Sequence, residues 1–300
     1  MPRSFCSVSS SIPRKLHSIN DVNHRNILGF GPQLAPGHPG FNDKLYKYRR
    51  QEIGKIAYKY TLDKPIPNVK YTKKEHEVWN KVLTHLKEEF PKHACDKYLK
   101  SYPLFDFNER VIPQLEDVSN TLYAHSGWRI RPVSGLLHPR EFLGGLAYKY
   151  FHSTQYVRHS SNPMYTPEPD VCHELIGHIP MLADKDFADF VQAIGRASLE
   201  ATDEQIWHLT KIYWYMVEFG VIREGESVKA FGAGILSSYG EMAHMASGNA
   251  EIVSFNPNVP QPKMNYKDGY QKRYFILDTF EDAQAMIEDY ISQMKNSVTS

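Results

Sequence analysis

Cysteine is scarce in this chain of 300 residues, which contains only Cys6, Cys95 and Cys172. Three widely spaced cysteines, an odd number, cannot form the set of bridges that holds small secreted domains together. The composition is typical of a reducing compartment. We therefore expect a cytoplasmic protein whose stability comes from a hydrophobic core.

An excess of charge of either sign is also lacking, because 35 basic residues face 34 acidic ones and give a formal charge of +1. Nucleic-acid binders usually carry a basic excess or a concentrated basic patch. The nearest candidate, the run Lys44, Lys47, Arg49 and Arg50, is typical of a solvated helix face. No apolar run approaches the roughly 20 residues that span a bilayer. We expect neither a nucleic-acid partner nor a membrane segment.

The first 20 residues contain six serines, three basic residues and no acidic residue. Such a composition resembles a mitochondrial transit peptide, but the segment has no amphipathic stripe. We therefore expect a disordered leader or linker over residues 1–20 and one globular domain over residues 21–300.

Periodic apolar positions predict a chain that is mainly α-helical with small β elements, an α+β fold. Helices are expected over residues 43–60, 73–90, 111–125, 142–155, 186–198, 202–220 and 283–294. Short strands are expected within residues 129–137 and at 274–277. No internal repeat or mid-chain linker divides the sequence, so we predict a single domain.

Two histidines, His173 and His178, lie five residues apart in an otherwise apolar stretch. On a regular helix of 3.6 residues per turn they would point about 140° apart and could not reach one ion. Gly177 and Pro180 are helix-ending signals. We therefore expect His173 to project from a helix and His178 from the unwinding end of that helix.

Glu218 is the candidate for a third ligand, because it stands in the apolar segment 212–220. A carboxylate buried there without a partner would cost several kcal/mol or become protonated. Two imidazoles and one carboxylate form the facial triad of non-heme iron(II) oxygenases, which leaves positions open for dioxygen and a co-substrate.

Three alternatives to an iron oxygenase stay open for these residues. The histidines can be core or capping residues, with Glu218 paired to an Arg or a Lys. The trio can also hold zinc in a hydrolase that uses Glu174 as its base, although the five-residue spacing departs from the zinc peptidase pattern. A metal- or pterin-binding protein without catalytic activity is the third alternative.

Longer motifs carry a family resemblance. They are residues 166–180, 213–220 and 231–241, with shorter ones at 38–41, 113–119 and 142–147. In this order they resemble the catalytic domain of the pterin-dependent aromatic amino acid hydroxylases, over roughly residues 12–295. The resemblance implies a helical, basket-like catalytic domain. The motifs do not extend to the regulatory domain or the tetramerisation arm of the family, and we expect neither in this chain. We expect this chain to be a monomer or a dimer, and a full-length form to be able to form a larger oligomer.

The resemblance implies that iron(II) is held by His173, His178 and Glu218, the trio reached above from their chemistry. It also implies a tetrahydropterin, tetrahydrobiopterin or a close relative, as the second cofactor. The family's pterin-binding positions match Gly135, Leu136, Leu137, Phe142, Glu174 and Tyr213. Phe142 can stack on the flat pterin ring, and Glu174 can contact its edge directly or through water.

The family's positions for the amino acid substrate match Arg158, Thr166, Pro167, Glu168, Trp214, Gly234 and Ser237. Arg158 is suited to a bidentate grip on the substrate carboxylate, with Asp170 as the partner that holds its guanidinium. Ser237 is expected to orient His173 and to fix its tautomer.

The resemblance implies hydroxylation of an aromatic ring with dioxygen, and small molecules as the binding partners. Tyr165 and Thr166 resemble phenylalanine hydroxylases, whereas residues 237–240 are closer to tyrosine hydroxylases. Trp214 is similar to both and unlike tryptophan hydroxylases, and residues 266–269 depart from all three patterns. We expect conversion of L-phenylalanine to L-tyrosine, with tyrosine or tryptophan as the alternative substrates.

Overall fold

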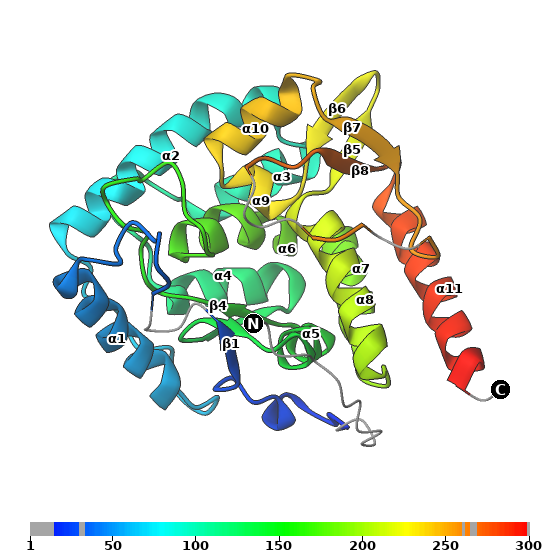
Figure 1. Ribbon diagram of the computed structural model, residues 1–300, viewed down its shortest axis with the longest axis horizontal. Coiled ribbons are helices and arrows are strands. Elements are labelled where there is room, and N and C mark those ends of the chain that lie inside the picture. The colour runs from blue at the N-terminus through cyan, green and yellow to red at the C-terminus, as the bar shows by residue number, and fades with distance from the viewer. Residues whose placement is uncertain (1–14, 30–33, 260–261, 265–268, 299–300) are drawn as a thin grey trace.

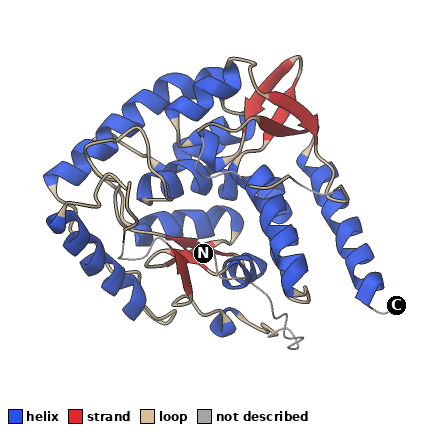
Figure 2. Ribbon diagram, in the orientation of Figure 1, coloured by secondary structure: helices blue, strands red, loops and turns tan. Residues whose placement is uncertain are grey.

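The computed structural model describes residues 15–29, 34–259, 262–264 and 269–298, and residues 266–268 of the predicted specificity segment lie outside this part. Most of the described chain is helical (Figure 2). The α-helices are α1 (Lys44–Lys59), α2 (Lys73–His93), α3 (Asp96–Ser101), α4 (Leu115–Ser126), α5 (Pro139–Ala147), α6 (Ile179–Ala183), α7 (Lys185–Ser198), α8 (Asp203–Tyr213), α9 (Ala233–Leu236), α10 (Tyr239–Ala246) and α11 (Phe280–Val298). Two π-helical segments, η3 (His173–His178) and η4 (Trp214–Glu218), and two 3-10 helices, η1 (Ile19–Asp21) and η2 (Tyr102–Phe105), complete the helical elements of the described residues.

The β structure is confined to small sheets. The strands are β1 (Ile27–Gly29), β2 (Arg129–Pro132), β3 (Leu136–Leu137), β4 (Tyr150–Ser153), β5 (Val221–Glu224), β6 (Ser227–Ala230), β7 (Glu251–Ser254) and β8 (Arg273–Leu277). β1 pairs with β3 in antiparallel fashion, and β2 pairs with β4 in parallel. The third sheet has the order β6-β5-β8-β7, in which only the β5–β6 hairpin is antiparallel.

Helix α6, which continues directly from η3, lies near the centre of the view, with the other helices around it (Figure 1). The long helix α2 and the four-stranded sheet lie along one edge of the view, and α7, α8 and α11 lie on another side. One continuous core joins these elements, and its largest fully buried side chains include Trp79, Trp128 and Tyr98. The predicted fold class, mainly helical with small sheets, is confirmed.

Most predicted elements lie where expected, with one clear error. Residues 150–153 form strand β4, although helical periodicity assigned them to a helix over 142–155. The helix ends at Ala147, because Lys149 takes a left-handed conformation (φ 60°) that a helix cannot contain. The strand that follows pairs along its full length with β2.

The folded part of the chain extends closer to the N-terminus than the predicted boundary at residue 20. Leu16 is buried, and Ser18 caps the short helix η1 with its side chain. Buried Arg131 of β2 donates to the carbonyl oxygens of Ile19 and Val22, at 3.3 and 3.1 Å. These contacts attach residues 16–29 to the β2–β4 sheet.

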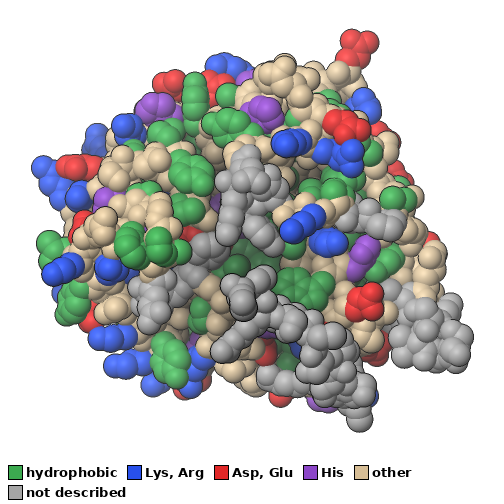
Figure 3. Space-filling view, viewed as in Figure 1, with side chains coloured by type: hydrophobic (Ala, Val, Ile, Leu, Met, Phe, Trp, Pro, Cys, Tyr) green, Lys and Arg blue, Asp and Glu red, His purple; other side chains and the backbone are tan. Residues whose placement is uncertain are grey.

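The surface shown in Figure 3 carries basic and acidic side chains intermixed, and hydrophobic side chains are visible near its hollowed centre. In the described part of the chain, no helix is both long enough and apolar enough to cross a membrane.

Candidate metal centre

Three side chains meet at the point where η3 and η4 approach each other. The Nε2 atoms of His173 and His178 lie 3.1 Å apart. The Glu218 carboxylate lies 3.4 Å from His173 Nε2 and 3.2 Å from His178 Nε2. Among the described residues, this trio is the one group of three or more His, Cys, Asp or Glu side chains that could share one metal ion.

The helix that carries both histidines does not unwind at Gly177, so the predicted geometry is wrong. It makes a π-helical turn from His173 to His178 and continues directly into α6. Hydrogen bonding from residue i to i+5 places residues five apart on the same face of the helix. The same distortion recurs in η4, which ends at Glu218.

Gly177 serves close packing between helices. A Cβ atom at this position would lie 2.6 Å from the carbonyl oxygen of Ala233 in α9. Only glycine permits η3 and α9 to approach this closely. This approach brings Ser237, the residue after α9, next to His173.

Ser237 fixes the tautomer of His173. Its hydroxyl has one hydrogen, which it donates to the Ala233 carbonyl oxygen at 2.7 Å. The hydroxyl oxygen therefore accepts a hydrogen bond from His173 Nδ1, 2.8 Å away. Nδ1 then carries the imidazole proton, and the lone pair of Nε2 faces Glu218 and His178.

The electrostatics of the trio favour a charged carboxylate. Burial alone would raise the pKa of Glu218, but the imidazoles of His178 and His173 outweigh it and hold the pKa well below its usual range. Glu218 is therefore an anion held between two imidazoles. This is the donor set that a divalent transition metal prefers.

The neighbouring acid, Glu174, is in a different environment. Its Oε1 accepts hydrogen bonds from the backbone and the hydroxyl of Thr154, at 3.1 and 3.2 Å. Burial raises the pKa of Glu174 to about 7.

Of the other residues predicted to bind the pterin, Phe142 and Tyr213 are in contact with each other. The rings of Phe142 and Tyr213 make an edge-to-face contact with centroids 5.0 Å apart. Tyr213 Oη is buried and has no hydrogen-bond partner among the described residues. Leu136 and Leu137 form strand β3, which follows Gly135 and pairs with β1.

Arg158 and Asp170 form a fully buried, bidentate ion pair. Arg158 Nε and Nη2 donate to the two carboxylate oxygens at 3.0 and 2.8 Å. Asp170 also accepts the backbone N–H of His173 at 3.1 Å, so the pair is joined to the first turn of η3. One edge of the guanidinium is thus occupied. On the other edge, Nη1 donates one hydrogen bond to the Pro163 carbonyl oxygen at 3.3 Å, and a contact of Arg158 with a substrate carboxylate stays a prediction.

Glu168 lies in a buried ion pair that the sequence did not reveal. Its Oε1 accepts hydrogen bonds from Arg50 Nη1 and from His38 Nε2, the latter at 3.2 Å. Thr166, in the same loop, donates to the Glu168 carbonyl oxygen at 2.7 Å. The loop is therefore attached to α1, and direct substrate contacts of Thr166, Pro167 and Glu168 stay predictions.

The interpretation of Arg50 as part of a solvated face is wrong. Its side chain is 2% exposed and lies 3.7 Å from the centre of the Tyr156 ring. The sequence contains a pattern that indicates burial of Arg50, because Arg50 lies on the same helical stripe as the buried residues Ile53, Gly54 and Ala57. Arg49, its neighbour, is partly exposed and pairs with Glu75 at 2.9 Å.

Trp214 and Gly234 lie on the η4 side of the centre. Trp214 packs against Phe219 with ring centroids 4.8 Å apart. A Cβ at Gly234 would lie 2.7 Å from the Phe219 ring, so Gly234 lets α9 pack closely against η4.

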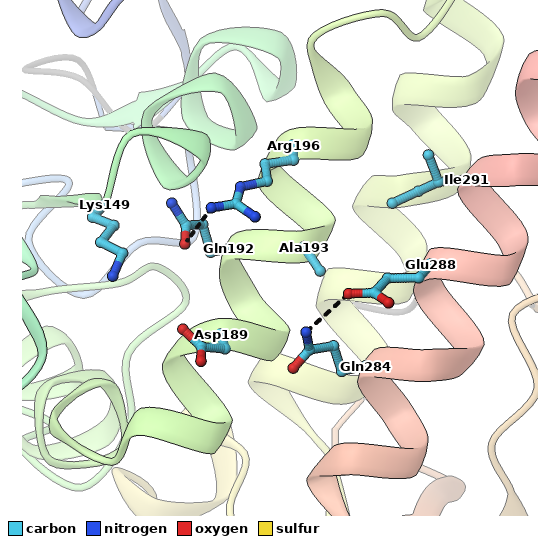
Figure 4. A pocket seen from close by; sticks show the side chains of 8 residues that line it. All are labelled: Lys149, Asp189, Gln192, Ala193, Arg196, Gln284, Glu288 and Ile291. Atoms are coloured by element: carbon cyan, nitrogen blue, oxygen red, sulfur yellow. Dashed lines mark hydrogen bonds between the residues drawn. The ribbon is translucent and has the colours of Figure 1, made fainter.

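A groove of about 390 Å³ between α7 and α11 is a separate feature (Figure 4). Its lining residues are Lys149, Asp189, Gln192, Ala193, Arg196, Gln284, Glu288 and Ile291. Arg196 donates to Gln192, and Gln284 donates to Glu288, so polar groups of the groove bind each other. None of the predicted site residues lies in it.

A family model described as biopterin-dependent aromatic amino acid hydroxylase matches residues 10–299. The chain belongs to this family. The resemblance deduced from its motifs is confirmed, and membership favours the oxygenase over the zinc hydrolase.

Similar proteins include other members of the hydroxylase family. A phenylalanine 4-monooxygenase of Pinus taeda is 54% identical over 96% of this chain and 80% of its own length. A tyrosine 3-monooxygenase of Homo sapiens is 45% identical over 94% of this chain and 54% of its own length. Among solved structures, a phenylalanine hydroxylase of Legionella pneumophila has a TM-score of 0.70 at 30% identity and covers 77% of this chain and 96% of its own. A phenylalanine hydroxylase of Chromobacterium violaceum with bound iron(III) and 7,8-dihydrobiopterin has a TM-score of 0.69 at 29% identity, over 76% of this chain and 84% of its own.

Replacing Arg50 with Met should destabilise the hydroxylase far more than replacing its neighbour Arg49 with Met. Breaking a buried ion pair from one side leaves Glu168 as an uncompensated buried charge, which costs about 3–5 kcal/mol. Losing the partly exposed pair of Arg49 and Glu75 should cost less, about 1 kcal/mol. Urea unfolding measures both free energies, and equal losses for the two variants would contradict the role assigned to Arg50.

Proposed function

We propose that this hydroxylase converts L-phenylalanine to L-tyrosine with dioxygen, a tetrahydropterin and an iron(II) ion held by His173, His178 and Glu218. The observation that carries the proposal is the convergence of two imidazoles and one ionised carboxylate on one point. The choice of phenylalanine is supported by the 54% identity to phenylalanine 4-monooxygenases, against 45% for a tyrosine 3-monooxygenase.

The spacing of the trio fits a single metal ion. Two ligand atoms about 2.1 Å from one ion lie about 3.0 Å apart at an angle of about 90°, and about 3.4 Å apart at the tetrahedral angle. The three separations, 3.1, 3.2 and 3.4 Å, fall within this interval. The two approaches to Glu218 involve different oxygens, Oε2 for His173 and Oε1 for His178, so the carboxylate can offer either oxygen to one ion.

A pterin fits beside the trio. Phe142 offers an aromatic face for stacking on the bicyclic ring, and the Oη of buried Tyr213, which has no partner in the described part of the chain, offers a polar contact. Glu174 offers an acceptor for the N–H edge of the pterin. When bound, iron(II) and the tetrahydropterin supply the reduction of dioxygen and the transfer of one oxygen atom to the ring.

The side chains of this protein position the substrate and exclude water. Arg158, held rigidly by Asp170, offers its Nη1 edge to the substrate carboxylate. Trp214 forms a wall for the aromatic ring on the η4 side of the centre. Because Glu218 and the histidines are largely enclosed, bulk water is kept from the reacting groups.

The cellular location and the oligomeric state stay proposals. A cytoplasmic location is proposed from the low cysteine content, while the relatives from Pinus taeda, Chlamydomonas reinhardtii and Physcomitrium patens carry the description chloroplastic. A monomer or a dimer is proposed for this chain.

An equimolar mixture of phenylalanine, tyrosine and tryptophan, incubated with the protein, iron(II), tetrahydrobiopterin and air, tests the function. We expect tyrosine formed from labelled phenylalanine as the main product, and no product from the Glu218→Ala variant. The exposed acid Glu226 gives a matched control, because Glu226→Ala should act like the original chain. Dihydroxyphenylalanine or hydroxytryptophan as the main product would overturn the choice of substrate.

Replacing Ser237 with Ala should weaken iron(II) binding without removing a ligand. Loss of the contact that holds the proton on His173 Nδ1 typically lowers metal affinity by about 10–100-fold. Calorimetric titration with iron(II) under argon measures the change, and the exposed Ser247→Ala serves as the control. Unchanged affinity in Ser237→Ala would show that the hydroxyl does not orient the ligand.

A further inference from the structure

Described residues of the connection between β7 (Glu251–Ser254) and β8 (Arg273–Leu277) are held by side chains of three helices. His208 of α8 donates from Nε2 to the Pro257 carbonyl oxygen at 3.0 Å. Tyr215 of η4 donates to the Lys263 carbonyl oxygen at 3.1 Å, and His244 of α10 donates to that of Gln271 at 3.0 Å.

Glu241 of α10 holds the end of this connection. Its carboxylate is buried, and one oxygen, Oε1, accepts both the Gln271 backbone N–H at 3.0 Å and the Tyr274 hydroxyl at 2.5 Å. His244, one helical turn further along α10, holds the Gln271 carbonyl. Both backbone polar groups of Gln271 are thus bound by side chains of α10.

Burying the Glu241 carboxylate costs free energy that an apolar side chain would not cost. Its transfer from water costs several kcal/mol, which a leucine of similar size would avoid. Burial raises the pKa of Glu241. What the carboxylate provides is an acceptor oxygen for two donors, the Gln271 backbone N–H and the Tyr274 hydroxyl, which lie 30 or more residues further along the chain.

Helix α10 begins beside the metal centre. Ser238 caps α10 by accepting the Glu241 backbone N–H at 3.3 Å. The residue before this cap is Ser237, whose hydroxyl contacts His173 Nδ1. The contacts of Glu241 therefore lie one helical turn from the serine that orients a ligand histidine.

We infer that Glu241 is a positioning residue, which locks the first turn of α10 to Gln271 and Tyr274 and thereby holds Ser237 against His173. It acts through Ser237 and the β7–β8 connection and touches neither substrate nor cofactor. The inference rests on the proposed function for its effect on turnover, but its structural part stands independently of that function.

Three substitutions distinguish the role of Glu241 as a hydrogen-bond acceptor from the role of its charge. Glu241→Leu removes the acceptor. Glu241→Gln keeps an oxygen that can accept both hydrogen bonds and removes only the charge. Glu251→Leu is the matched control, because Glu251 is an exposed acid of β7 that pairs with Arg273 of β8 through an exposed contact.

The first measurement is amide hydrogen exchange of the metal-free protein, which needs no activity. In Glu241→Leu we expect faster exchange both in residues 269–274 and in residues 237–241, with Glu241→Gln and Glu251→Leu close to the original chain. Tyr274→Phe, which removes a single hydroxyl, gives a milder variant and should show a smaller change in the same two segments if Glu241→Leu does not fold. Faster exchange limited to residues 269–274 would overturn the link to Ser237.

The second measurement is the fraction of oxidised tetrahydropterin that yields hydroxylated amino acid. Misplaced reacting groups lower productive turnover by about 10–100-fold. Glu241→Leu should therefore show a fall of this order in coupling and a higher KM for the amino acid. Glu241→Gln should keep the coupling and the KM of the original chain. A folded Glu241→Leu with unchanged coupling, or a Gln variant as impaired as the Leu variant, would overturn the inference. Absence of product from the original chain would instead count against the proposed function and leave the exchange result to decide the inference.

Discussion

Two imidazoles face the partly buried Glu218 carboxylate and lower its pKa, and the need to bring all three groups together determines how the surrounding helices are built. The histidines lie five residues apart, so η3 must be π-helical for both to face the carboxylate, and η4 has the same distortion. π-helical turns are rare and are frequently found at functional sites. Gly177 allows α9 to approach, and Ser237 then sets the tautomer of His173.

Buried ion pairs attach the loops around the centre to the helical body. Arg158 and Asp170 join the loop before η3 to its first turn, and Arg50 and Glu168 join the same loop to α1. Such pairs contribute little to net stability compared with apolar packing, but they define one geometry because each broken pair is costly. We interpret them as the reason that the loop before η3 keeps one position relative to α1 and η3.

Much of this molecule could be predicted from its sequence. The trio His173, His178 and Glu218 was found from residue chemistry, and most helices from periodicity. The π-helical turn at His173–His178 could not be predicted, because Gly177 and Pro180 also signal the end of a helix. Only the contact of Gly177 with α9 decides between a helix end and a π-helical turn. Strand β4 was missed because a short apolar run has no unique period, and its pairing with β2 is a long-range interaction. The partners of Glu168 and Glu241 lie 118 and 30 or more residues away, beyond the reach of local patterns.

X-ray absorption at the iron edge of the iron(II)-loaded protein tests the central claim most directly, because it counts the ligand types at the metal. Two imidazoles together with oxygen donors, and no sulfur, are the result expected from His173, His178 and Glu218. Three or more imidazoles would contradict the assignment. A sulfur ligand would contradict it as well, and would point to Cys172, the buried thiol that precedes His173.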